Sequence, residues 1–148
     1  MELKFTVAGR IAKPVAEVFE AVVAPERLSK YFTTGGARGR LETGAEVTWD
    51  FHDFPGAFPV QVQEVVQDER IVLQWEADHS PGTWTTVTMT FEELEDGRTL
   101  VRISEYGWSE TPDGLKSCLG NCEGWAGMLC AMKAWLEHGI ILREGFYR

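Results

Sequence analysis

The chain has 148 residues, of which 44% are hydrophobic and 25% are charged, a composition typical of one soluble globular domain. We therefore treat residues 1–148 as a single domain that is long enough to bury a core. The formal net charge of −9 argues against binding to nucleic acid or to an anionic membrane, because both depend on clustered Lys and Arg side chains.

The sequence shows neither a membrane anchor nor a secretion signal. No hydrophobic run approaches the ~20 residues of a membrane-spanning helix. The first residues, Met1 to Lys4, do not lead into the hydrophobic stretch of a signal peptide. A cytoplasmic location is therefore expected.

The first forty residues predict one strand followed by two short helices. Residues 2–11 alternate between hydrophobic and polar side chains, which indicates a half-buried strand. Pro14 is placed to begin a short helix, because its missing N–H costs nothing in a first turn. Pro25 ends that helix and begins a second helical turn that runs to Phe32. Residues 33–40 contain glycines at 35, 36 and 39 and predict a loop or a weak edge strand.

Residues 45–107 predict an antiparallel sheet, because hydrophobic residues recur at every second position in several short runs. The Asp96-Gly97 pair predicts a hairpin turn before the last strand. The expected inward-facing positions are Ala45, Val47, Trp49 and Phe51, then Val60, Val62 and Glu64, then Ile71, Leu73, Trp75 and Ala77, then Val87, Met89 and Phe91, and finally Val101, Ile103 and Glu105.

A long amphipathic helix is predicted from Thr111 to about His138. Thr111 is a typical N-cap, with Pro112 in the first helical position, and Gly139 is a typical residue to follow the helix end. The expected hydrophobic face comprises Leu115, Cys118, Cys122, Trp125, Leu129, Met132 and Leu136. A sheet followed by one long helix must bury this face against the sheet, and a curved sheet would enclose a cavity there.

This order of elements resembles the helix-grip fold of the START-like (SRPBCC, Bet v 1-like) superfamily. The resemblance implies an α+β domain in which a curved antiparallel sheet wraps around a long C-terminal helix, with two short helices after the first strand. Four segments are similar to the family related to the activator of heat-shock protein 90 ATPase: IAKPVAEVFEA at 11–21, PERLSKYF at 25–32, ERIVLQW at 69–75, and Gly124-Trp125 with Leu136-Glu137-His138-Gly139 on the helix. Members of the superfamily include small-molecule binders, a few cyclases and dehydratases, and co-chaperone domains, so the fold alone does not select a function.

Glu105 is the residue that most suggests chemistry. Its parity with Val101 and Ile103 places its carboxylate in the cavity, where burial would raise its pKa and suit it as an acid, a base or a polar anchor. Glu64 has the same parity with Val60 and Val62. A bulge or a strand end would instead turn either carboxylate to solvent. The expected ligand-binding wall comprises Trp49, Phe51, Trp75, Met89, Phe91, Trp125, Leu129 and Met132, with Glu105 and Glu64 as anchors.

The three cysteines do not predict a metal site or a disulfide framework. Cys118 and Cys122 share a helix face, but no histidine or further thiol lies nearby in the sequence to complete a tetrahedral site. Together with Cys130 they are expected to be small buried residues. We expect neither a metal nor another cofactor.

Small residues form a second stripe on the long helix, opposite its hydrophobic face. The stripe comprises Gly120, Gly124, Gly127, Ala131 and Ala134. Helical glycines cost roughly 1 kcal/mol each relative to alanine, but they let another backbone approach closely. The stripe could be a homodimer seam, a seat for the chain's own residues 140–148, or a strip that faces solvent.

Three hypotheses for function follow. The first is a cytoplasmic domain that binds a small apolar or aromatic ligand between sheet and helix, without turnover. The second is a co-chaperone-type module that meets a chaperone through its acidic surface. The third is a cyclase or hydro-lyase that uses Glu105 as acid or base, in which case Glu105→Gln would abolish turnover.

Overall fold

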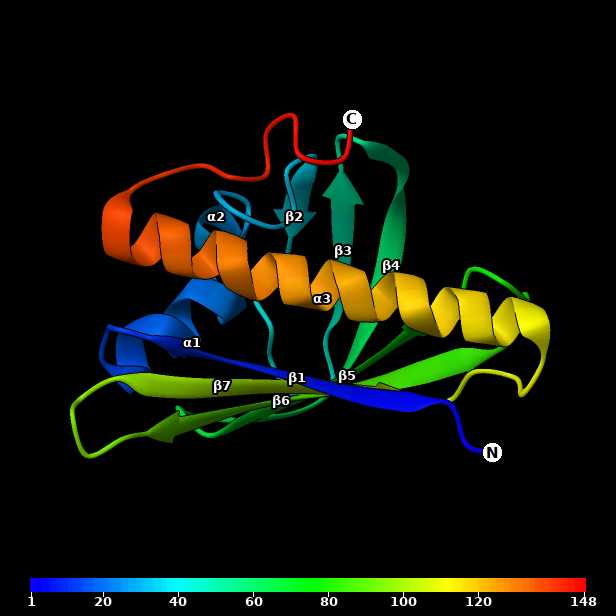
Figure 1. The fold of residues 1–148 in the computed structure, drawn as a ribbon, viewed down its shortest axis with the longest axis horizontal. Helices are drawn as coiled ribbons and strands as arrows, with labels where there is room; N and C mark the ends of the chain where they lie inside the picture. The colour runs from blue at the N-terminus through cyan, green and yellow to red at the C-terminus, as the bar shows by residue number, and fades with distance from the viewer.

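The computed structural model describes residues 1–54 and 56–148 and shows one seven-stranded antiparallel sheet with a long helix across one face (Figure 1). The strand order is β1-β7-β6-β5-β4-β3-β2. The elements are β1 (Lys4–Ile11), α1 (Val15–Val23), α2 (Pro25–Leu28), β2 (Gly36–Arg38), β3 (Glu46–Phe51), β4 (Phe54–Val66), β5 (Arg70–Glu76), β6 (Trp84–Glu93), β7 (Thr99–Tyr106) and α3 (Pro112–His138). In Figure 1, β1, β6 and β7 run below α3 while β2, β3 and β4 rise behind it, so the sheet curves around the helix. The predicted α+β helix-grip architecture is confirmed.

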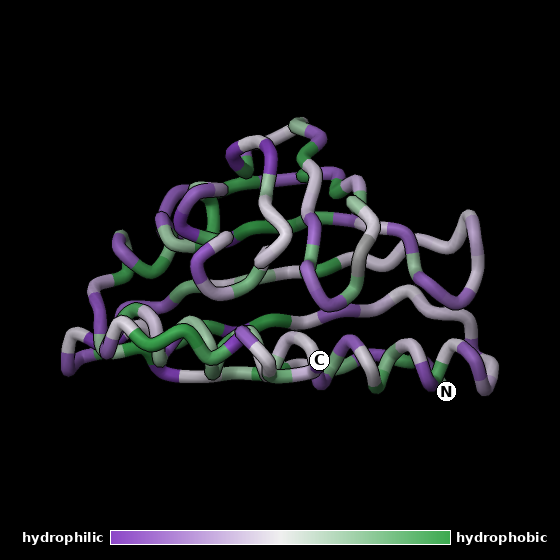
Figure 2. The backbone as a smooth tube through the Cα atoms, turned by 90° about the horizontal axis from the view of Figure 1, so that it is seen from above, coloured by the Kyte–Doolittle hydropathy of each residue, from purple (hydrophilic) through white to green (hydrophobic). Residues whose placement is uncertain are grey.

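The alternation of side chains sets which face of the sheet is buried. In β6 and β7 every second residue is buried, including Val87, Met89, Val101 and Ile103. Short hydrophobic and hydrophilic stretches accordingly alternate along the chain in Figure 2. Burial of apolar surface against α3 stabilises the fold by about 25 cal/mol per Å². A slip of one residue in the strand pairing would turn all of these buried side chains to solvent, so burial fixes the register.

The prediction for Glu64 is wrong, and a β-bulge is the reason. The register of β4 against β5 shifts between Val62 and Glu64, so Glu64 pairs with Val72 and leaves the inward parity of Val62. The Glu64 side chain is 45% exposed and forms a salt bridge with Arg70 at 2.6 Å. Glu64 is therefore a surface carboxylate and not a pocket anchor.

Helix α3 begins and ends where its capping residues predict. The Thr111 hydroxyl accepts a hydrogen bond from the Gly114 N–H at 3.1 Å. Gly139 adopts a φ of 67°, and its N–H donates to the Trp135 carbonyl at 2.9 Å. Leu115 is predicted to lie on the buried face, but it is 46% exposed. In this first turn it is the neighbouring Gly114 that faces the protein, with its backbone packed against the Ser109 carbonyl. Within the described residues, no helix is long and apolar enough to span a membrane.

The predicted small-residue stripe is divided in the structure. Ala131 is buried in the main hydrophobic core, so it faces the sheet and is not part of an exposed seam. Beside Gly127 lies Tyr147, whose hydroxyl would be 2.6 Å from a Cβ at that glycine. A Cβ on Gly120 or Gly124 would meet no described atom within 4 Å. The chain's own tail thus occupies one part of the stripe, and a homodimer through the open part stays a prediction.

The tail, residues 140–148, returns over α3 to the tips of β3 and β4 (Figure 1). Arg143 is only 7% exposed and forms an ion pair with the buried side chain of Asp53. Its guanidinium also lies over the rings of Phe51, at 5.8 Å, and Tyr147, at 4.8 Å from the ring centroids. The tail is therefore anchored by one buried cation.

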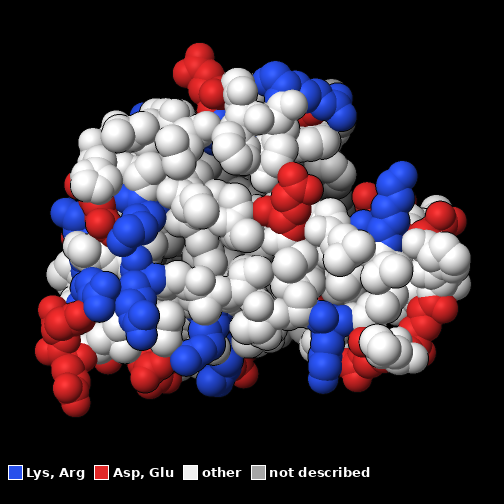
Figure 3. Space-filling model, in the orientation of Figure 1, with Lys and Arg blue, Asp and Glu red and all other residues white. Residues whose placement is uncertain are grey.

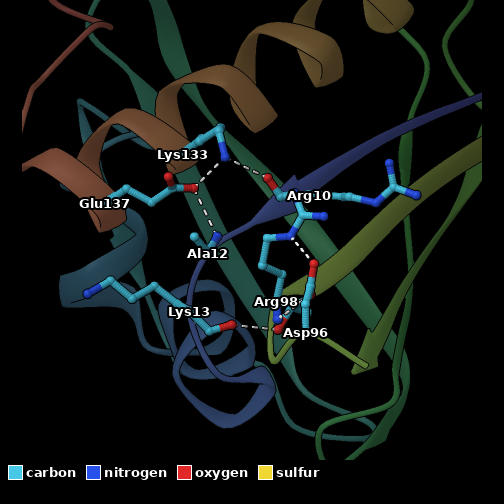
Figure 4. Close-up of polar contacts among 8 residues, drawn as sticks. Arg10, Ala12, Lys13, Asp96, Arg98, Lys133 and Glu137 are labelled. Atoms are coloured by element: carbon cyan, nitrogen blue, oxygen red, sulfur yellow. Dashed lines mark hydrogen bonds and ion pairs between the residues drawn. The ribbon is translucent and has the colours of Figure 1, made fainter. Parts of the chain in front are cut away.

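The C-terminal end of α3 is fastened to the link between β1 and α1 (Figure 4). Glu137 accepts hydrogen bonds from the Ala12 backbone N–H at 2.9 Å and from Lys133 Nζ at 2.5 Å. Lys133 also donates to the carbonyl of Arg10 at 2.9 Å. These contacts hold the C-terminal end of α3 against β1, the edge strand of the sheet.

The cysteines differ in exposure. Cys118 is buried, Cys122 is intermediate, and Cys130 is exposed. The prediction that all three are buried is wrong for Cys130 and only partly correct for Cys122. Cys130 follows Gly127 by one helical turn, so it lies on the face of α3 that the tail, and not the sheet, approaches.

Candidate functional site

Glu105 lies in β7 with no exposed surface, as its parity predicts. It pairs with Phe5 of β1 on one side and with Val87 of β6 on the other, so it sits in the interior of the sheet and not at an edge. No bulge interrupts β7 between Val101 and Glu105, and the two-residue period therefore carries the carboxylate to the face beneath α3.

Four neutral side chains donate hydrogen bonds to the Glu105 carboxylate. Oε1 accepts from Trp125 Nε1 at 2.8 Å. Oε2 accepts from Thr85 Oγ1 at 2.6 Å and from Trp75 Nε1 at 3.0 Å. Asn121 Nδ2 lies 3.2 Å from Oε1 and 3.0 Å from Oε2. An ionised carboxylate, which only accepts, matches this set of donors.

The electrostatics of Glu105 are nevertheless strained. Burial raises the pKa of the Glu105 carboxyl above its ordinary value, and the hydrogen bonds from Thr85, Trp75, Trp125 and Asn121 offset only part of that rise. No cationic side chain of the described residues forms a salt bridge with it. Glu105 is thus a buried acid without a counterion.

Aromatic rings surround the carboxylate. The Trp75 and Trp125 rings are 5.5 Å apart, and the Trp49 ring meets both edge-on at 5.7 and 6.4 Å. Phe32 stacks on Trp125 at 5.2 Å and meets Phe51 edge-on at 5.0 Å. Trp49 and Trp125 are buried, whereas Trp75 is partly exposed.

The other predicted wall residues lie in the same hydrophobic core. Phe91 meets Phe19 of α1 edge-on at 5.3 Å, so it serves the contact between α1 and the sheet. Leu129 faces β1 near Gly9. Met89 and Met132 are fully buried in the same hydrophobic core.

Sequence reasoning missed three residues of the site. Thr85 has the parity of Val87 and faces inward, a signal that was available in the sequence. Asn121 precedes Trp125 by one helical turn and therefore lies on the same face. Phe32 follows α2, and nothing in the local pattern indicates that it reaches Trp125.

Side chains fill the space around the Glu105 carboxylate, since Glu105 has no exposed surface and Trp49 and Trp125 are 1% and 2% exposed. Two surface hollows, of about 290 and 520 Å³, lie beside Leu41 and beside Gly36, and none of the ten predicted site residues lines either. Among the described residues, no group of three or more His, Cys, Asp or Glu side chains could hold a metal ion. A ligand at Glu105 would therefore have to displace a side chain.

Comparison with known proteins places the fold among characterised structures. Residues 12–137 match the family model for activator of Hsp90 ATPase homolog 1-like protein. No curated protein matches the chain. The protein SSP2350 from Staphylococcus saprophyticus is 28% identical, with a TM-score of 0.79 over 95% of this chain and 96% of its own.

Two further solved structures share the fold. The Aha1 dimer from Colwellia psychrerythraea is 22% identical, with a TM-score of 0.76 over 92% of this chain and 97% of its own. DynU16, a protein in the dynemicin biosynthetic locus, is 24% identical, with a TM-score of 0.81 over 97% of this chain and 50% of its own. These similarities confirm the helix-grip fold.

Proposed function

The chain belongs to the family of activator of Hsp90 ATPase homolog 1-like proteins, and we propose that it is a cytoplasmic single-domain binder of a small apolar or aromatic molecule. The ligand would lie between the sheet and α3, with Glu105 as its polar anchor, and the domain would act by binding without turnover. The observation that carries this proposal is the fully buried Glu105 carboxylate, set among aromatic rings and without a cation.

The energetics of Glu105 support a functional role. An ionised carboxylate in a protein interior costs several kcal/mol, and replacing buried charges by well-packed apolar side chains often leaves a protein equally or more stable. A core that needed only stability would therefore favour an apolar residue at position 105. A perturbed carboxyl beside apolar surface is instead typical of sites that bind or react.

The test is to detect a ligand directly and to ask whether Glu105 holds it. Native mass spectra of the freshly purified protein should show a non-covalent adduct that disappears on denaturation. Aromatic compounds that bind should raise the melting temperature through mass action. Glu105→Gln should weaken both effects, whereas Glu64→Gln, which changes a surface carboxylate, should leave them unaltered. A clean mass and no thermal shift across a broad panel would refute the proposal.

Family membership favours a second candidate, a co-chaperone-type interaction module. The side of the molecule shown in Figure 3 carries Asp and Glu mostly near its periphery, with uncharged surface over much of its middle. A pull-down with a heat-shock protein 90 chaperone at low salt tests this candidate, and a salt titration tests whether charge holds the complex. No complex at low salt would exclude it.

The enzyme hypothesis stays a prediction. A raised pKa suits Glu105 to proton transfer, but four donors already occupy both of its oxygens. A substrate would have to replace one of them before the carboxyl could act.

A further inference from the structure

Trp75 differs from the two other indoles of the site in its exposure. Trp49 and Trp125 are 1% and 2% exposed, whereas Trp75 lies near the end of β5 and remains partly exposed. Its ring nevertheless reaches inward, 5.5 Å from the Trp125 ring, and its N–H donates to Glu105 at 3.0 Å. Of the three indoles, Trp75 is thus the one that can leave the cluster without crossing the core.

We propose that Trp75 occupies the ligand's position in the free protein, and that the ligand is a planar aromatic molecule carrying an N–H or O–H donor. This inference rests on the proposed function and specifies its ligand class. Turning the Trp75 side chain outward would vacate a flat space beside Trp49 and Trp125 and would free one acceptor position on Glu105. The indole in that space shows the shape and the donor that the site accepts.

A donor is required because the ionised Glu105 carboxylate offers only acceptor positions. A ligand without a donor would leave Oε2 without the hydrogen bond that Trp75 now donates to it. A ligand with a phenol, pyrrole or indole donor restores that bond. The exchange of Trp75 for such a ligand is therefore nearly balanced in hydrogen bonds.

Trp49 adds a preference for an acceptor on the same ligand. Its Nε1 is buried and has no hydrogen-bond partner among the described residues. The Trp49 ring lies 5.7 Å from the ring of Trp75, so it would border the vacated space. A carbonyl or ether oxygen that reaches this N–H would satisfy a donor that the free protein leaves unpaired.

The rest of the cluster stays in place when Trp75 moves. Phe32 stacks on Trp125, and the Trp125 N–H keeps its own bond to Oε1 at 2.8 Å. Thr85 and Asn121 also remain on the carboxylate. The site would therefore be preformed on every side except the one that Trp75 closes.

The substitution Trp75→Phe shows whether Trp75 competes with the ligand or forms a wall of an existing binding site, because the two roles predict opposite changes in ligand affinity. A phenylalanine lacks the N–H that holds Trp75 on Glu105, so a competing side chain becomes easier to displace. We expect indole, titrated by calorimetry, to bind Trp75→Phe about tenfold more tightly than the unaltered protein. If Trp75 is a wall of an existing site, the same substitution weakens binding. Trp84→Phe is the matched control, since Trp84 is 40% exposed and lies on β6 outside the site.

The probe 1-methylindole tests the need for a donor. It keeps the planar ring but lacks the N–H, and we expect it to bind at least about tenfold more weakly than indole. In NMR spectra of the unaltered protein, indole should shift the Trp75 N–H signal, assigned by its absence in Trp75→Phe, far more than that of Trp125. Weaker indole binding to Trp75→Phe, or equal binding of the two probes, overturns this inference and leaves the proposed function standing. If no aromatic probe binds either protein, both are overturned.

Discussion

The Tyr147 hydroxyl lies 2.6 Å from the position that a Cβ on Gly127 would occupy, so the C-terminal tail is seated on a helix residue without a side chain. This contact explains one glycine of α3. A glycine in a helix interior loses about 1 kcal/mol relative to alanine, and here that loss permits the tail to lie close to the helix. At Gly124, one turn earlier, a Cβ would meet no described atom within 4 Å.

Alanine substitutions at Gly124 and Gly127 should therefore have different effects. Gly124→Ala should raise the free energy of unfolding by about 1 kcal/mol, because the new methyl group meets no described atom. Gly127→Ala should gain less or lose stability, because Tyr147 must move. The double variant Gly127→Ala/Tyr147→Phe removes the clashing hydroxyl and should recover most of the gain. Urea unfolding measures all three, and equal gains at the two glycines would show that Tyr147 does not occupy this position.

The raised pKa of Glu105 predicts a pH dependence of stability. The folded protein keeps the Glu105 proton above the ordinary pKa of 4.5, at which the unfolded chain releases it. The stabilising contribution of the protonated form is therefore complete below that value and is lost as pH rises through the folded pKa. Glu105→Gln should flatten the fall in unfolding free energy that sets in as pH rises above about 4.5.

Other perturbed carboxyls do not obscure this window. Burial raises the pKa of Asp53, but the Arg143 guanidinium more than offsets it and holds the pKa below its ordinary value of 3.8. The stability that Asp53 supplies is thus lost only as pH falls through a lower value, with the opposite slope. A Glu105→Gln variant that retains the full slope of the unaltered protein would contradict the assignment to Glu105.

Removing one partner of the ion pair between Arg143 and Asp53 should lower the unfolding free energy more than removing both partners. Arg143→Met leaves the buried Asp53 carboxylate without a counterion, and we expect a loss of about 3 kcal/mol in unfolding free energy. The double variant Asp53→Leu/Arg143→Met removes both charges and should recover much of that loss. Arg102→Met is the control, because its partner Glu92 is exposed and the change should cost at most about 1 kcal/mol. Equal losses in the single and double variants would mean that charge pairing does not hold the tail.

The sequence predicted the fold well because the fold depends on local patterns. Alternation marked the strands, and Thr111 and Gly139 marked the ends of α3 with residue types that satisfy helix termini. The two-residue period of a strand placed Glu105 on the inner face of the sheet correctly, but it placed Glu64 there wrongly. A single bulge reverses parity for every residue beyond it, and the hydrophobic pattern around Val62 and Val65 does not reveal the bulge.

The contents of the site were less predictable than its location. Phe32 enters from a segment distant in sequence, and its stacking on Trp125 is a tertiary contact that no local period encodes. The filling of the cavity depends on side-chain rotamers, which decide whether Trp75 lines a space or occupies it. Sequence parity places Trp75 on the inner face but does not set its χ angles.

The Thr85 hydroxyl donates the shortest of the hydrogen bonds to the Glu105 carboxylate, at 2.6 Å, and it should therefore stabilise the site. Thr85→Val keeps the shape of the side chain and removes only the hydrogen bond. A bond to an ionised group contributes roughly 1.5–3 kcal/mol, so we expect a loss of that order near neutral pH. In the Glu105→Gln background the same change should cost less, because the acceptor is neutral. Urea unfolding of the four proteins gives the coupling directly. A coupling near zero would mean that Thr85 stabilises the sheet by packing alone and that Glu105 does not depend on its hydroxyl.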